Sequence, residues 1–204
     1  MKKIGKIAQM TLVILLIAPA VAFALRYLDF RVHGILTGKG EILDSLLYRT
    51  GFYLHVILGL VALLSGPLQF SPGMRSKKPG YHRMAGKVYV AACLISGLAG
   101  LCIAQFATGG WITRLGFSGL AIAWLYTTSR AYFHIRRRQI DLHKRWMFRS
   151  YALTFAAATL RIYLGIMIAG GVAFLVAYQI VSWACWVPNL IAVEWIWVRK
   201  MSVD

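Results

Sequence analysis

Residues 51–106 read GFYLHVILGLVALLSGPLQFSPGMRSKKPGYHRMAGKVYVAACLISGLAGLCIAQF. Two apolar runs flank a short segment that is dense in Pro, Gly and Lys. A helix of ~20 apolar residues, rising ~1.5 Å per residue, crosses the ~30 Å hydrocarbon core of a bilayer. Each run has this length, so the stretch predicts two transmembrane helices joined by a basic turn.

The same pattern continues along the whole chain. It predicts an all-α, polytopic membrane protein with about six transmembrane helices in one bundle, forming a single domain over residues 1–204. The composition agrees, because 59% hydrophobic and 14% charged residues differ from the ~45–50% and ~25% of soluble domains. So many apolar residues also exclude a disordered chain. The predicted spans are residues 7–28, 51–70, 88–106, 111–133, 147–169 and 172–198.

The net charge of +17 is distributed unevenly between the loops. Most Lys and Arg residues precede the first span, follow the last, or lie in segments 75–87 and 130–149. The positive-inside rule therefore predicts cytoplasmic termini, with anionic lipids as partners at that face. Because topology explains the charge, no nucleic-acid partner is expected. A signal peptide cleaved after Ala24 is the alternative for the first span, but its apolar run exceeds the usual ~7–15 residues.

Small and polar residues follow single faces of the predicted helices, since residues three and four apart share a face. Small residues let helices approach closely, and they leave room for a ligand beside an imidazole. We therefore expect these faces to meet inside the bundle, with residues of the stripes around a pocket: His55, Gly59, Gln69, Gly86, Tyr89 and Arg161. The stripes are His55, Gly59, Ala62, Gly66 and Gln69; His82, Gly86, Tyr89, Cys93, Ser96 and Gly100; and His143, Met147, Ser150, Thr154, Ala158, Arg161 and Gly165.

His82 and His143 begin two predicted helices that run in the same direction, so they share a depth near the cytoplasmic face. Two imidazoles at one depth could be the axial ligands of a haem b iron or could bind a divalent metal. His134 and Asp141 are weaker candidates for further ligands, and Asp141 is also the expected N-cap of the fifth span. Alternatively, these histidines only form hydrogen bonds near the lipid headgroups.

Arg161 is the charged residue expected deepest in the membrane, roughly nine residues or ~14 Å from the outer end of its helix. An arginine at depth costs at least ~2.5 kcal/mol and normally has a partner. No acidic residue lies at that depth in the sequence. We therefore expect Arg161 to contact carbonyls, Gln105, Gln179, a tyrosine, water or an anionic ligand, with His55 nearby. Snorkelling towards the interface is the alternative.

The segments HVILGLVALLSGPLQF, HRMAGKVYV and DLHKRWMFRSYALTFAAATLRIYL together resemble a family of bacterial predicted membrane proteins, domain of unknown function 2306. The resemblance covers residues 48–164 and implies a multi-pass protein of the bacterial cytoplasmic (inner) membrane, without an established activity. The family pattern is carried by His55, Gly59, Gly66, Gln69, His82, Arg83, Gly86, Tyr89, Asp141, His143, Trp146, Arg149 and Arg161.

A weaker, fold-level likeness is to cytochrome b561 and ferric reductase proteins, whose central helices hold haem b through paired histidines. This chain departs from that pattern, because His55 has no second histidine at its depth in another span. At most one haem, near the cytoplasmic face, is therefore expected.

Three hypotheses for function follow. The first is a haem b or metal protein that exchanges electrons with a quinone or a redox partner. The second is a transporter or a lipid- or quinone-binding module that uses Arg161. The third is an accessory subunit whose small-residue faces, with Gly59 and Gly86, dock other helices. Hydrolytic catalysis is not expected, because the chain shows no nucleophile, base and acid set.

Overall fold

In the computed structural model, residues 2–32, 34–199 and 201 are described, without the side chains of residues 2–11 and Ile35. All regular structure in these ranges is helical, which confirms the all-α prediction. The short elements are η1 (Gly34–Leu36), η2 (Gly40–Asp44) and α3 (Pro72–Lys77). The longer ones are α1 (Lys2–Leu25), α2 (Leu46–Gln69), α4 (Pro79–Ala104), α5 (Gly110–Arg136), α6 (Ile140–Thr154), α7 (Ala156–Ala169), α8 (Phe174–Ala184) and α9 (Val187–Val193), which the π-helical turn η3 (Glu194–Val198) extends.

Four helical stretches are long and apolar enough to cross a membrane: Leu46–Gln69, Pro79–Ala104, Ile140–Ala169 and Phe174–Val198. Leu12–Leu25 is a shorter apolar helix. α5 is long but more polar, because it carries Arg114 and Arg130 within its length. The structure therefore supports a multi-pass membrane protein with four candidate spans, and the count of six stays a prediction.

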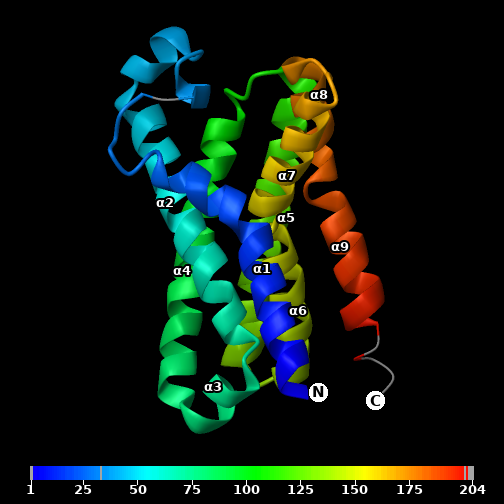
Figure 1. The fold of residues 1–204 in the computed structure, drawn as a ribbon. Coiled ribbons are helices and arrows are strands. Elements are labelled where there is room, and N and C mark those ends of the chain that lie inside the picture. The colour runs from blue at the N-terminus through cyan, green and yellow to red at the C-terminus, as the bar shows by residue number, and fades with distance from the viewer. Residues whose placement is uncertain (1, 33, 200, 202–204) are drawn as a thin grey trace.

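The long helices run up and down between two ends of one bundle (Figure 1). One end holds the start of α1, α3, the start of α4, the turn between α5 and α6, and η3 (Figure 1). The basic segments 75–87 and 130–149 belong to these elements, so we call it the basic end. The opposite end holds residues 26–32 and 34–45 and is called the loop end.

The turn between α5 and α6 brings the chain back into the bundle at the basic end. Arg138 has a φ of 60°, in the left-handed region, and Gln139 is the N-cap of α6. The prediction that Asp141 caps this helix is wrong, because Asp141 lies in the first turn. Reversal of the chain at Arg138 starts α6 earlier than the Asp signal indicates.

The core lies where α4, α5 and α6 meet, and α2 packs on α4 along most of its length. Ala62, Tyr89, Cys93, Trp124 and Met147 form the largest buried cluster. Gly100 shows how closely α2 and α4 approach, because a Cβ there would lie 2.8 Å from Nδ1 of His55. The small residues of both helices thus serve packing inside this chain.

Candidate functional site

Three histidines gather at the basic end, on three different helices. His82 lies in the first turn of α4, His143 in the first turn of α6, and His134 in the last turns of α5. His143 is close enough to His82 and His134 for their charges to interact. The fold thus brings together residues that are far apart in the sequence.

The ring nitrogens of these histidines are only partly used. His143 Nδ1 lies 2.9 Å from the carbonyl oxygen of Ala131, and His134 Nδ1 lies 2.6 Å from Gln139 Oε1. Because both oxygens only accept, each Nδ1 carries the proton and each Nε2 keeps a lone pair. His134 Nε2 and His82 Nδ1 are buried without a hydrogen-bond partner among the described residues. An outer hydrogen bond of this type is what orients metal-ligating histidines.

The acidic candidate ligand lies apart from this cluster. Asp141 Oδ1 pairs with Nζ of Lys144 at 2.9 Å, and its side chain is 83% exposed. Among the described residues, no group of three or more His, Cys, Asp and Glu side chains is arranged to hold a metal ion. A metal bound here would therefore have two protein imidazoles at most in the present arrangement, with the other positions open.

His55 joins α2 to α4 in the half of the bundle nearer the loop end. Its Nδ1 lies 2.9 Å from the carbonyl oxygen of Ser96, and Ser96 Oγ donates to the carbonyl oxygen of His55 at 2.9 Å. A Cβ on Gly59 would lie 3.4 Å from Ser96 Oγ, and one on Gly86 would lie 3.0 Å from Gln69 Oε1. These candidate pocket residues contact one another across the α2–α4 interface.

Tyr89 is fully buried and belongs to a network of hydroxyl groups between α4, α5 and α6. Its hydroxyl lies 2.8 Å from Ser150 Oγ and 2.9 Å from Thr154 Oγ1. Thr128 Oγ1 lies 2.7 Å from Ser150 Oγ, and Trp124 Nε1 donates to Thr154 Oγ1 at 2.9 Å. The predicted polar faces of α4 and α6 therefore do meet in the interior, through a network that satisfies its own members.

Arg161 lies on α7, and no carboxylate of the described residues pairs with it. The ion pairs between described residues are Lys144–Asp141 and Arg149–Glu194. Nη1 of Arg161 donates to the carbonyl oxygen of Ala157 at 2.9 Å, and its guanidinium carbon lies 4.2 Å from the Phe23 ring centroid. Its Nε is buried and has no hydrogen-bond partner in the described part of the chain. His55 is near enough for their charges to interact. The expected use of a carbonyl is confirmed.

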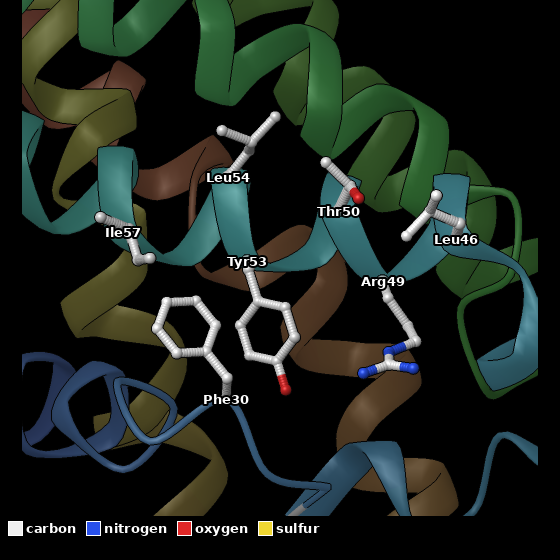
Figure 2. Close-up of a pocket in the computed structure, with 7 residues that line it drawn as sticks. All are labelled: Phe30, Leu46, Arg49, Thr50, Tyr53, Leu54 and Ile57. Carbon is white, nitrogen blue, oxygen red and sulfur yellow. The ribbon is translucent and has the colours of Figure 1, made fainter.

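Grooves of ligand size open on the surface of the described residues, and no candidate residue from the sequence lines the two described next. The groove near the loop end has a volume of about 380 Å³. Figure 2 shows Phe30 beside Tyr53, with Arg49 on the same helix. The ring centroids of Phe30 and Tyr53 are 5.1 Å apart, and the Tyr53 hydroxyl donates to the carbonyl oxygen of Arg31.

The groove near the basic end, about 420 Å³ in volume, lies between α5, α6 and the last helix. Tyr126, Trp146, Arg149, Leu190 and Glu194 are among its lining residues. From the sequence, Trp146 and Arg149 were members of a family pattern and were not predicted to line a site. Their spacing of three residues on one helix face was the signal that could have found this groove.

A family profile described as "Predicted membrane protein (DUF2306)" matches residues 52–198. No curated protein and no solved structure matches the chain. The resemblance stated from the sequence blocks is thus confirmed and extends further towards the C-terminus, whereas the fold-level likeness to cytochrome b561 has no support.

Proposed function

The chain belongs to the DUF2306 family of predicted membrane proteins, and from this premise we propose that it is a metal-binding protein of the bacterial inner membrane. His82 and His143 are the proposed ligands, with His134 as a third imidazole close by. The observation that carries this proposal is the hydrogen bond from His143 Nδ1 to the Ala131 carbonyl oxygen. It leaves Nε2 free to bind a metal and holds the ring in one orientation.

The metal could be a divalent ion or a haem b iron, since both bind neutral imidazole. A divalent ion is the smaller of the two, and neither the groove near the loop end nor the groove near the basic end is lined by His82 or His143. Asp141 is directed to Lys144 instead and is not part of the proposed site. If haem is the bound group, it supplies one-electron chemistry, and the protein transfers electrons to a quinone or a redox partner.

Purified protein tests the proposal through its absorption spectrum and a metal analysis. A Soret band indicates haem, and a stoichiometric metal without that band indicates a divalent ion. His82→Ala and His143→Ala should each lose the metal, whereas Lys144→Ala, one residue from His143 and partly exposed, should keep it. A colourless, metal-free preparation with full folded yield would refute the proposal.

We also propose six membrane crossings with both termini in the cytoplasm. The start of α1 and the end of η3 lie at the same end of the bundle, which supports an even number of crossings. A single cysteine at Thr37 should react with an impermeant maleimide in intact cells, and one at Ser76 only after permeabilisation. Equal labelling of both before permeabilisation would contradict this topology.

A second candidate function rests on Arg161, whose charge no carboxylate of the described residues balances. A carbonyl or anionic ligand such as a quinone would satisfy the guanidinium in a transporter or a quinone-binding module. A short-chain ubiquinone should then raise the melting temperature of the protein, and Arg161→Leu should abolish this effect without reducing expression. An unchanged effect in that variant would refute this function.

The accessory-subunit hypothesis receives no comparable support. Gly59 and Gly86, the residues on which it depends, contact Ser96 and Gln69 of the same chain. Co-purification of a stable partner, lost when either glycine is enlarged, stays the test that distinguishes this hypothesis.

A further inference from the structure

The groove near the basic end changes from apolar to polar along its length. α5 and the last helix both run towards the basic end (Figure 1). Ala123, Leu190 and Ile191 therefore lie towards the middle of the bundle, and Trp146 and Glu194 lie nearer its end. The groove is thus apolar at mid-depth and polar near the interface, in the same order as the acyl chains and the headgroup of a phospholipid in one leaflet.

The polar part of this groove is lined by the ion pair of Arg149 and Glu194, and a further arginine, Arg130, lies next to it beside Trp146. The Trp146 ring has two guanidinium groups beside it, with Arg149 at 4.5 Å and Arg130 at 5.5 Å from the ring centroid. Arg149 is already paired, because it donates two hydrogen bonds of 2.9 Å each to the carboxylate of Glu194. Arg130 has no carboxylate partner in the described part of the chain, and its Nε is buried without a hydrogen bond. One cation without a carboxylate partner among the described residues thus lies next to the polar part of the groove, beside Trp146.

The groove is also open to the surroundings of the bundle. Ile191 is 56% exposed and Trp195 is 63% exposed, and both line it. Exposed tryptophan and tyrosine side chains are typical of the interface between membrane and water, and Tyr126 contributes another aromatic ring at 55% exposure. An occupant can therefore enter sideways from the bilayer.

We propose that this groove is a specific site for an anionic phospholipid of the leaflet at the basic end. The headgroup phosphate pairs with Arg130 beside Trp146, and one acyl chain covers Ala123, Leu190 and Ile191. Charge decides between candidate occupants: a neutral quinone would leave Arg130 unbalanced, and a free phosphate ion would leave the apolar wall uncovered. Basic pockets between helices on the cytoplasmic side are the usual sites of this type.

The test uses the full chain in detergent with added short-chain lipids. Dihexanoyl phosphatidylglycerol should raise the melting temperature of the wild type more than dihexanoyl phosphatidylcholine does at equal concentration. Arg130→Gln should bind the anionic lipid about fivefold more weakly, which corresponds to the ~1 kcal/mol of one arginine near a membrane surface. Arg75→Gln removes one exposed charge from α3 at the same end, so it is the matched control and should bind as the wild type does.

Ile191→Trp provides a second variant, because this exposed side chain can fill the groove without entering the core. It should weaken binding of both lipids while the melting temperature without lipid stays unchanged. Equal stabilisation of the wild type by the two lipids would overturn the proposal, as would equal weakening in Arg130→Gln and Arg75→Gln. Stabilisation by inorganic phosphate alone, as large as that by the anionic lipid, would overturn it in favour of a simple anion site.

Discussion

Replacing Tyr89 with phenylalanine should destabilise the protein by about 1–2 kcal/mol, because the hydroxyl of Tyr89 connects two polar groups in the core. Thr154 Oγ1 donates to the carbonyl oxygen of Ser150 at 3.0 Å and accepts from Trp124 Nε1 at 2.9 Å. Its remaining lone pair therefore accepts the hydrogen of Tyr89. The Tyr89 oxygen in turn accepts from Ser150, which accepts from Thr128. Every hydroxyl hydrogen in this network has an acceptor.

The Tyr89→Phe variant removes two of these hydrogen bonds. Hydrogen bonds inside membrane proteins contribute ~0.6 kcal/mol each on average, which gives the lower part of the expected range. One hydroxyl hydrogen, on Ser150 or on Thr128, also loses its acceptor, and a buried unsatisfied group costs ~1–3 kcal/mol. Rotation of these two small side chains recovers part of that cost. The phenylalanine ring keeps the packing of the site, so no cavity term is added.

Denaturant titration in mixed micelles measures this difference as a change in the free energy of unfolding. Tyr132→Phe is the matched control, because this tyrosine is 43% exposed on α5 and should change stability by less than ~0.5 kcal/mol. A double-mutant cycle with Ser150→Ala should show coupling between the two positions. Equal stability of Tyr89→Phe and Tyr132→Phe, or full additivity in the cycle, would refute the proposed network.

Three further perturbations follow from the same geometry. Gly116→Leu should destabilise the bundle by ~1–3 kcal/mol, because a Cβ there would lie 2.9 Å from the backbone oxygen of Ser182. Thermal melting measures this loss of stability, and an unchanged melting temperature would contradict the close approach of α5 and α8. Glu194→Gln should cost under ~1 kcal/mol, since the ion pair with Arg149 is partly exposed, and added salt should shrink the difference in denaturant titrations. Burial, and then the charge of a neighbouring arginine, lower the pKa of Lys39 in the folded protein. The unfolded chain therefore binds this proton more tightly, and the free energy of unfolding should rise as the pH increases from the folded to the unfolded pKa. An identical pH dependence of stability in Lys39→Met would argue against this.

Much of the fold was predictable because transmembrane helices are a local property of the sequence. The apolar runs predicted which segments form transmembrane helices, and the basic segments predicted which loops lie at the same end of the bundle. Boundaries were less accurate: α4 begins at Pro79, three residues before His82, where this helix was expected to begin. The turn at Arg138 likewise shifted the start of α6.

The candidate residues were predictable in kind but not in arrangement. His82, His134 and His143 lie at the basic end, with His143 close enough to the other two for their charges to interact, whereas their use as ligands stays a prediction. Asp141 departs from them, since Lys144 on the next helical turn attracts its carboxylate. The groove around Trp146 was missed, because it depends on how far the last helix stands from α5 and α6, and no pattern within one helix specifies that distance.

The sequence by itself determined the helical class, the membrane environment and the gathering of positive charge at one end, since these depend on hydropathy and charge summed over local segments. Only the tertiary structure decided which polar residues satisfy one another. The Tyr89 network is closed, whereas Nε of Arg161, Nε of Arg130 and the free ring nitrogens of His82 and His134 still lack hydrogen-bond partners among the described residues. The physical reason is that hydrogen bonds and ion pairs act over about 3 Å, so they depend on the exact packing of helices that are distant in the chain.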